Sequence, residues 1–285
     1  MRCVLTDPIC ENSGSLLVAI PAIAAHLPIV EISLSRLRER FKNASFLIVS
    51  PSPHLFNHLA DKQTRIAPDS EFAAVSKIEV EGLLSPNKRQ RSGWYYQQLL
   101  KYAIVFDAPF VRVLILDADT VVLREIEIAH NEFFTSKERH KPYFQHFLTL
   151  FNADPPFKSS AITNFMWFRP VALRRMLSEI EKIHKKSWLR AIIDIVNLIE
   201  HDGAFSEYET YANWFALRNG PHKELPIHIF RRGDLLLSKK RNYRRVVDQV
   251  LRSNFDSVAF ELNHRQDIIR KIGSQIILRL SIKDW

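Results

Sequence analysis

Apolar and polar positions follow strand-like and helix-like patterns in turn over the first sixty residues. Unbroken apolar runs at residues 16–20 and 46–49 predict two strands that are covered on both faces. Residues 29–41 between them repeat apolar positions at helical spacing, and a short helix is expected over residues 54–60. Strand and helix in alternation predict an α/β fold with a doubly wound, mostly parallel sheet flanked by helices.

The clearest strand in the pattern is the apolar run Val113 to Leu116, which ends on Asp117-Ala118-Asp119. Ligands of open α/β sheets bind beyond the carboxyl ends of such strands. Residues one apart in extended backbone point to the same side, and a bend after Leu116 would let one carboxylate bind directly and the other through water. Two hard oxygen ligands suit Mg²⁺ or Mn²⁺ held together with a substrate phosphate.

Asp-x-Asp is short, and most copies are solvated turns. Here an apolar segment, Val121 to Leu123, follows at once. Two carboxylates this near a core repel each other and lose hydration, and a cation would offset both costs. The context therefore favours a metal site.

The rest of the chain predicts further strands and helices without a repeat or a low-complexity linker. We expect strands at residues 78–80, 161–168, 226–230 and 258–262, a loop with a short helix at 126–137, an aromatic-rich insertion at 141–156, and helices at 94–106, 171–184, 188–199, 206–217, 243–251 and 267–272. A single domain spanning residues 1–285 is expected, with a basic helical segment at about 231–285 packed on it.

Composition excludes several classes of protein. Only seven glycines occur, and neither GxGxxG nor GxxxxGK[ST] is present, which argues against a dinucleotide-binding Rossmann enzyme and a P-loop ATPase. Cys3 and Cys10 form neither a disulfide framework nor a zinc pattern, and they fit a reducing compartment. Neither a secretory signal nor a good membrane-spanning segment is evident, so we expect a cytoplasmic protein.

The formal net charge of +9 favours anionic partners. Basic residues cluster late, in Arg231-Arg232, Lys239-Lys240-Arg241 and Arg244-Arg245. Such runs are usually solvated faces. The function they suggest is binding of a diphosphate or peripheral contact with the anionic inner face of a membrane.

The segment Ser92 to Lys101 is the second candidate site. Ser92 is expected to cap a helix, and the basic residues that precede this helix would attract phosphate to its N-terminus. Lys101 would reach a diphosphate, and Gln97 or Gln98 would bond a sugar or base. The alternative is an amphipathic helix whose Trp94 and tyrosines belong to the core.

Two further positions, Glu207 and Asn164, carry candidate chemistry. Ser206 and Glu209 form a capping box, which leaves Glu207 free to face a cleft and accept a proton from a hydroxyl nucleophile. Asn164, inside an apolar strand, must be hydrogen-bonded and is a candidate contact to a donor sugar.

His264 follows the last predicted strand. A lone histidine is more often structural, and completion of the metal site by His264 is the alternative. His228, flanked by isoleucines, is a weaker candidate for the same position.

Four segments together resemble the nucleotide-sugar-dependent glycosyltransferases of the GT-A type, and more narrowly a bacterial group of glycosyltransferases classified under domains of unknown function. The segments are SGWYYQQLLK (92–101), LILDADT (114–120), ITNFM (162–166) and SEYETY (206–211). The resemblance implies a metal-dependent transfer of a sugar from a nucleotide-diphosphate sugar to the hydroxyl of a glycan or lipid-linked acceptor, in cell-surface polysaccharide or glycoconjugate synthesis.

The resemblance also assigns roles to residues. Asp117 and Asp119 would bind Mn²⁺ or Mg²⁺ bridging the diphosphate, with Asp119 and Glu207 as catalytic residues. Glu207 would be the base if the reaction inverts the anomeric centre and would position substrate if it retains it. The segment 21–27 departs from the resemblance, because it is apolar where such enzymes often place polar residues for the base.

Two other functions stay open. A nucleotidyl- or phosphotransferase would use the same Asp pair, and a non-catalytic binder of anionic glycans or nucleic acid would rely on the +9 charge. The glycosyltransferase interpretation expects no nucleic acid partner.

Overall fold

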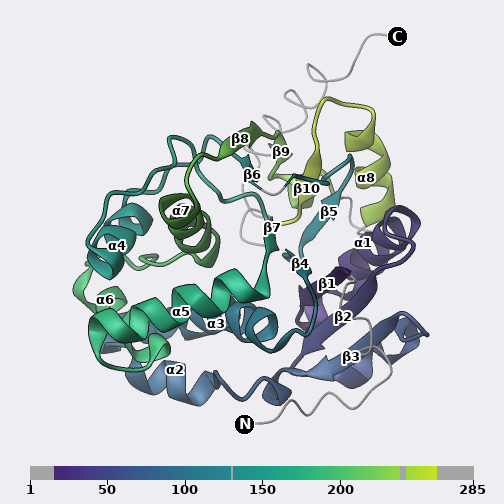
Figure 1. Ribbon diagram of the computed structural model, residues 1–285. Coiled ribbons are helices and arrows are strands. Elements are labelled where there is room, and N and C mark those ends of the chain that lie inside the picture. Colours follow the sequence, from purple (N-terminus) through teal and green to yellow (C-terminus); the bar gives the residue numbers. More distant parts are fainter. Residues whose placement is uncertain (1–15, 130, 238–241, 262–285) are drawn as a thin grey trace.

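A five-stranded sheet forms the centre of the molecule. The computed structural model describes residues 16–129, 131–237 and 242–261 (Figure 1). In the order β3-β2-β1-β4-β7, its strands are β1 (Leu16–Pro21), β2 (Ser45–Ser50), β3 (Thr64–Pro68), β4 (Arg112–Leu116) and β7 (Phe165–Phe168). All neighbours pair in parallel except β4 and β7, which are antiparallel. The predicted α/β class with a mostly parallel sheet is confirmed.

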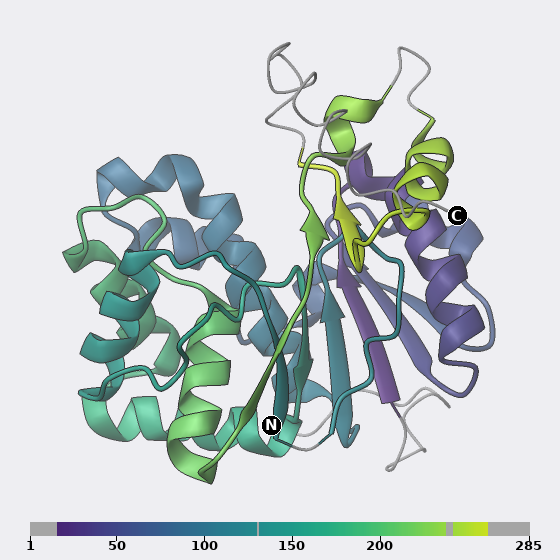
Figure 2. The same ribbon diagram turned by 90° about the horizontal axis from the view of Figure 1, so that it is seen from above.

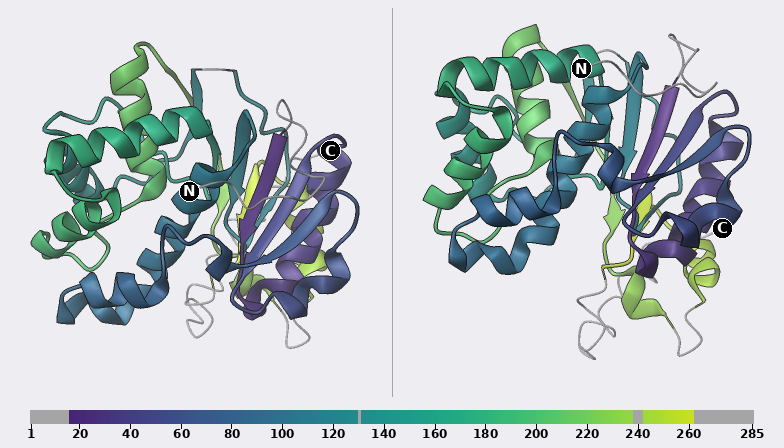
Figure 3. Two further views of the ribbon diagram at one scale, coloured as in Figure 1. Left: turned by 60° about the horizontal axis from the view of Figure 1, so that its bottom comes forward. Right: turned by 90° about the horizontal axis from the view of Figure 1, so that it is seen from below.

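Helices cover both faces of this sheet (Figure 2). They are α1 (Leu27–Arg40), α2 (Lys77–Leu83), α3 (Ser92–Asp107), α4 (Lys141–Phe151), α5 (Pro170–His184), α6 (Trp188–Leu198), α7 (Glu207–Asn219) and α8 (Tyr243–Leu251). Helices α2 to α7 gather on one face and α1 lies on the other, as the views from below also show (Figure 3). None of the described helices is both long and apolar enough to cross a bilayer.

The alternation of side chains along β1 explains the two layers. Leu17 and Ala19 pack into the large core with α2 to α7, whereas Val18 and Ile20 pack into the core formed with α1. Successive residues of a strand point to opposite faces, so an unbroken apolar run is what a strand between two helical layers requires.

Two smaller sheets extend the fold beyond the Asp pair. They are β5-β10-β9, with β5 (Thr120–Val122), β9 (Ile229–Phe230) and β10 (Ser257–Ala259), and β6-β8, with β6 (Glu132–Thr135) and β8 (Lys223–Pro226). Strand β10 runs antiparallel to β5, and the Phe260 amide donates to the carbonyl oxygen of Asp119 at 2.9 Å. Helix α8 packs on α1 through a third apolar cluster.

Several sequence predictions are wrong locally. Residues 78–80 belong to α2, whose N-cap Ser76 accepts from the Glu79 amide, and Ile78 is 85% exposed. The segment expected to be a loop with a short helix contains β6, and the expected insertion contains α4. Strand β3 was not predicted, because its Thr and Arg interrupt the apolar pattern of an edge strand. The predicted strand at 258–262 is described only as the three residues of β10, and the predicted helix at 267–272 lies outside the described residues.

The predicted caps and strand limits also change near the site. Arg91, not Ser92, is the N-cap of α3, and it makes no side-chain cap bond. The strand expected from residue 161 begins only at Phe165, and Asn164 before it has a φ of 64°.

Candidate active site

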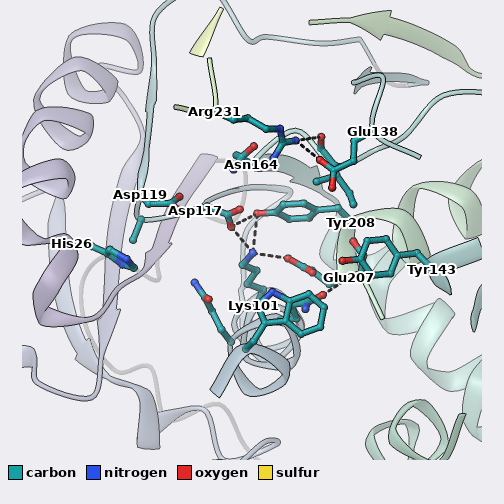
Figure 4. Close-up of a pocket in the computed structure, with 16 residues that line it drawn as sticks. His26, Lys101, Asp117, Asp119, Glu138, Tyr143, Asn164, Glu207, Tyr208 and Arg231 are labelled. Atoms are coloured by element: carbon teal, nitrogen blue, oxygen red, sulfur yellow. Dashed lines mark hydrogen bonds and ion pairs between the residues drawn. The ribbon is translucent and has the colours of Figure 1, made fainter. Parts of the chain in front are cut away.

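A pocket of about 260 Å³ lies beyond the carboxyl end of β4, between α3, α7 and the loop that precedes β7 (Figure 4). It gathers predicted residues that are far apart in the sequence, namely Trp94, Gln97, Gln98, Lys101, Asp117, Asp119, Asn164 and Glu207. The topology explains this meeting, because ligands of open α/β sheets bind where the strands end.

The centre of the pocket is an ion-pair network around Lys101. Its ammonium binds Oδ1 of Asp117, lies 2.5 Å from Oε1 of Glu207 and lies 3.2 Å from the Tyr208 hydroxyl. The Tyr208 hydroxyl donates to the same oxygen of Asp117 at 2.9 Å. Lys101 is 3% exposed, and two carboxylates compensate its charge.

The ion pairs of this network oppose the effect of burial on the pKa values of its charged groups. Burial acts to lower the pKa of Lys101, but Asp117 and Glu207 outweigh it and raise that pKa above its usual value. Burial raises the pKa of Glu207, against the attraction of Lys101. Lys101 therefore stays an ammonium ion at neutral pH.

The charge of the Asp119 carboxylate is compensated less than the charges around Lys101. Its pKa is raised to about 6, first by burial and then by the nearby charge of Asp117. The Thr120 hydroxyl donates to it at 3.2 Å, and no ion pair to it occurs in the described part of the chain. A buried carboxylate beside a second carboxylate is a donor pair suited to a hard cation.

The described residues do not complete a metal site by themselves. Within residues 16–129, 131–237 and 242–261, no three His, Cys, Asp or Glu side chains are arranged to hold an ion. His264, the predicted third ligand, lies outside the described residues. His228 is exposed beside Asp256 and is absent from the pocket lining, so it does not join the Asp pair.

Asn164 is held in the left-handed region of backbone space and is buried. Its carbonyl oxygen accepts from the Asp117 amide at 2.8 Å, which ties the loop to the Asp pair. Its side-chain Oδ1 is buried with no hydrogen-bond partner among the described residues. A buried carboxamide oxygen that lines a pocket without a partner is a candidate contact to a ligand.

Glu209 performs half of the expected capping box. The Ser206 hydroxyl accepts from the Glu209 amide at 3.3 Å, as predicted. The Glu209 carboxylate instead accepts from the Ser160 hydroxyl and from the Ala161 amide, the latter at 3.1 Å. It therefore fixes the loop that leads to Asn164.

Sequence reasoning did not assign four of the residues that line the pocket, namely His26, Glu138, Tyr143 and Tyr208. Arg231 extends across the pocket to Glu138 at 2.8 Å (Figure 4) and to Glu261 at 3.4 Å. Arg231 was visible only as one member of a basic run. Tyr208 could have been found, because it follows Glu207 on the same first turn of α7.

A second, mostly apolar pocket of about 390 Å³ adjoins the first. It shares His26, Trp94 and Gln97 with the first pocket, and its apolar lining comes from Pro21, Ala22, Ile23, Val49, Pro51, Tyr96 and Leu100. The apolar segment after β1 thus forms a wall. The Tyr96 hydroxyl also lies 3.0 Å from Asp69, a carboxylate at the edge of this pocket.

Three solved structures to which this chain is similar are glycosyltransferases by their own descriptions. A galactosyltransferase, LgtC, in complex with donor and acceptor sugar analogs shows 12% identity over 94% of this chain and 97% of that chain, at a TM-score of 0.47. Mouse xyloside xylosyltransferase 1 in its apo form shows 12% identity over 86% and 96%, at 0.41. The glycosyltransferase GlyE of Streptococcus pneumoniae shows 10% identity over 94% and 63%, at 0.43.

Sequence comparison gives the family. The curated proteins contain no significant match to this chain. Residues 25–232, well over half of the chain, match DUF6492, a family of unknown function. The chain therefore belongs to the DUF6492 family.

Proposed function

We propose that this protein is a metal-dependent glycosyltransferase that moves a sugar from a nucleotide-diphosphate sugar to a hydroxyl acceptor. The observation that carries the proposal is the partly buried pair Asp117 and Asp119 in a pocket of unusual charge. Four carboxylates and two cationic side chains line this pocket, whereas the whole chain has a formal net charge of +9. A pocket with excess negative charge in a basic protein favours a cation, and a cation in turn favours a diphosphate.

Asp117 and Asp119 would hold the divalent ion, Mn²⁺ or Mg²⁺. When bound, the ion would stabilise the charge that develops on the leaving nucleoside diphosphate. Arg231, rather than the buried Lys101, is the cation that we assign to the phosphates, because its side chain lines the pocket and is 29% exposed. The Oδ1 of Asn164, which has no partner among the described residues, would accept a hydrogen bond from a hydroxyl of the donor sugar.

The second pocket supports a place for the nucleoside. It is apolar, adjoins the first pocket through Trp94 and Gln97, and begins at the carboxyl end of β1. A flat base has large apolar faces, and apolar pockets with a few polar groups are the usual sites for such ligands.

Glu207 is better suited to positioning substrate than to removing a proton. Its carboxylate is buried and lies 2.5 Å from the Lys101 ammonium, so it is already engaged in an ion pair, although burial raises its pKa on balance. We therefore assign Glu207 to a hydrogen bond with a substrate hydroxyl, the role expected of it in a retaining enzyme. Measuring the anomeric configuration of the product by NMR tests this assignment, and an inverted product would contradict it.

The main experiment is a screen of nucleotide sugars with Mn²⁺ or Mg²⁺. We expect release of a nucleoside diphosphate, and we expect nucleoside diphosphates to raise the melting temperature only when metal is present. Asp117→Asn and Asp119→Asn should abolish both effects, whereas Asp248→Asn, on the exposed face of α8, should change neither.

Other outcomes of this screen would identify other functions. Release of pyrophosphate would indicate a nucleotidyltransferase that uses the same Asp pair. Binding that depends steeply on salt and survives both Asp substitutions would indicate a non-catalytic binder of polyanions.

We also propose that the enzyme works at an anionic membrane surface, on glycan or lipid-linked acceptors for the cell surface. Exposed Arg244 and Arg245 on α8 and Arg252 at its C-cap support this location, since none has an ion pair among the described residues. Co-sedimentation with phosphatidylglycerol vesicles, but not phosphatidylcholine vesicles, tests it. Equal binding to both kinds of vesicle would contradict an electrostatic contact.

A further inference from the structure

Two aromatic side chains face each other at one end of the pocket. Trp94 on the first turn of α3 and Tyr143 on the first turn of α4 have ring planes inclined by 22° and ring centroids 6.5 Å apart. Both rings are partly exposed and both line the pocket. The proposed transfer reaction assigns no role to Tyr143.

Neighbouring side chains hold these two rings in place. The Arg91 guanidinium lies 4.5 Å from the centre of the Trp94 ring, and the His140 ring packs edge-on against Tyr143 at 4.4 Å. His140 is fixed in turn by the carbonyl oxygen of Gly203 at 2.9 Å. A wall whose rings are already supported loses little conformational freedom when it binds a ligand.

The position of Tyr143 separates it from the proposed path of the donor. A donor that extends from the apolar second pocket to the Asp pair passes Trp94 and Gln97, which line both pockets. Tyr143 and Glu138 line the first pocket but not the second. Both lie on the side of the first pocket away from His26, which lines both pockets (Figure 4).

We propose that Tyr143, with Trp94 beside it, forms the acceptor subsite, and that the acceptor is an uncharged saccharide. This inference rests on the proposed function. A sugar ring has an apolar face of C–H groups, which suits an aromatic wall, and a rim of hydroxyls, which suits nearby carboxylates. Glu138 and Glu207 supply such carboxylates on the same pocket lining.

The charge of the pocket argues against acidic acceptors. Its four carboxylates outnumber its two cationic side chains, so an acceptor with its own carboxylate or phosphate at the reacting sugar would be repelled. In the transfer, the bond from the anomeric carbon to the diphosphate oxygen breaks and a bond to an acceptor hydroxyl oxygen forms. The proton of that hydroxyl leaves with the released diphosphate.

The test separates donor use from acceptor use with a donor identified by hydrolysis. Without acceptor, the KM for the nucleotide sugar is measured from its slow hydrolysis. With acceptor, transfer is measured to neutral p-nitrophenyl hexosides, to p-nitrophenyl glucuronide, to a polyprenyl phosphate and to a serine-containing peptide. We expect transfer to one or more neutral hexosides in preference to the other three probes.

Variants at Tyr143 then locate the subsite. Tyr143→Ala should raise the KM for the neutral hexoside by about tenfold and leave the KM for hydrolysis within about twofold. Tyr143→Phe keeps the ring and should stay near the unmodified protein. Phe144→Ala is the matched control, because Phe144 is the next residue of α4 and does not line the pocket.

Two results would overturn the inference while leaving the proposed function intact. One is an equal effect of Tyr143→Ala on the two KM values, and the other is preferred transfer to the glucuronide, the polyprenyl phosphate or the peptide. Failure of the proposed function would look different, since the unmodified protein would then hydrolyse no nucleotide sugar. In that case, titrating the protein with neutral methyl hexosides while tryptophan fluorescence is measured tests the aromatic wall directly. The inference is overturned if the hexosides cause no fluorescence change that is lost in Trp94→Phe.

Discussion

The Nζ atom of Lys101 lies 2.5 Å from Oε1 of Glu207, and each of these side chains is only 4% exposed. The pair joins α3 to α7 across the floor of the pocket, and Asp117 completes it from the end of β4. One buried ammonium thus compensates two carboxylates from different elements. A buried carboxylate that loses its partner is strongly destabilising, so the stability of the fold and the shape of the site depend on the same three residues.

Lys101→Met should therefore lower the free energy of unfolding by about 3–5 kcal/mol, as measured by urea denaturation. The loss comes mainly from the uncompensated carboxylates that remain. Adding Glu207→Gln to the Lys101→Met protein should recover part of it, because one of the two buried charges is then removed.

Lys88→Met is the matched control for this cycle. Lys88 is equally buried, but its ammonium binds the carbonyl oxygens of Ile199 and His201 rather than carboxylates. Its loss should be destabilising, and Glu207→Gln should not relieve it. Equal relief of the two methionine variants by Glu207→Gln would contradict the assignment of Lys101 as the compensating charge.

Asn164 combines a backbone role with a side-chain role, and two substitutions separate them. Its φ of 64° is unstrained for glycine but costs an alanine about 1 kcal/mol or more. Asn164→Gly should thus be more stable than Asn164→Ala in urea denaturation. Both lack the carboxamide that faces the pocket, so both should slow hydrolysis of the nucleotide sugar to a similar extent.

A difference in hydrolysis that follows the difference in stability would show that only the backbone matters. Asn152 offers a control, since it also has a positive φ, of 48°, at the end of α4 and does not line the pocket. Asn152→Gly and Asn152→Ala should show the same order of stability without a change in hydrolysis.

The sequence predicts the sheet well wherever a strand is buried on both faces. The runs that form β1, β2 and β4 are unbroken because helices cover both sides of them. Edge strand β3 and the short strand β6 escape prediction, since each mixes polar residues into the pattern. Strand β6 also pairs with β8, a distant part of the chain.

For a similar reason, only part of the site can be predicted from the sequence. Asp117 and Asp119 can be identified from the sequence because they follow an apolar strand. Tyr143 and Arg231 enter the same pocket from loops and helices whose positions depend on tertiary packing, which no local pattern contains. Sequence reasoning also could not show that the charge of Lys101 is taken up by Asp117, because that contact spans separate elements.

Asp119→Asn should separate metal binding from stability. In the absence of metal, Asp119 is a partly buried carboxylate next to Asp117, and removing its charge relieves repulsion. Differential scanning calorimetry should therefore show a higher melting temperature for the metal-free variant than for the metal-free unmodified protein. Addition of Mn²⁺ should raise the melting temperature of the unmodified protein alone. A metal-free variant that melts lower would show that the carboxylate is already compensated.

Glu209 should make the fold less stable as the pH rises. Burial raises its pKa to about 7, although hydrogen bonds from Ser160 and Ala161 act to lower it. The ordinary value of 4.5 applies to the unfolded chain. Between these two pH values the folded state holds a proton that the unfolded state has lost. The contribution is thus fully present below pH 4.5 and is lost as the pH rises through about 7.

The size of this effect on the free energy of unfolding is on the order of 3 kcal/mol, which follows from the separation of the two pKa values. Glu209→Gln should remove it, so that the unmodified protein loses stability relative to the variant between pH 5 and pH 8 in urea denaturation. Glu179→Gln is a control with the opposite sign. Burial opposes the shift there, but hydrogen bonds from Arg218 and Trp214 lower the pKa of Glu179, so its contribution is lost only as the pH falls below 4.5. A difference between the unmodified protein and Glu209→Gln that stays constant from pH 5 to pH 8 would show that Glu209 is already ionised in the folded state.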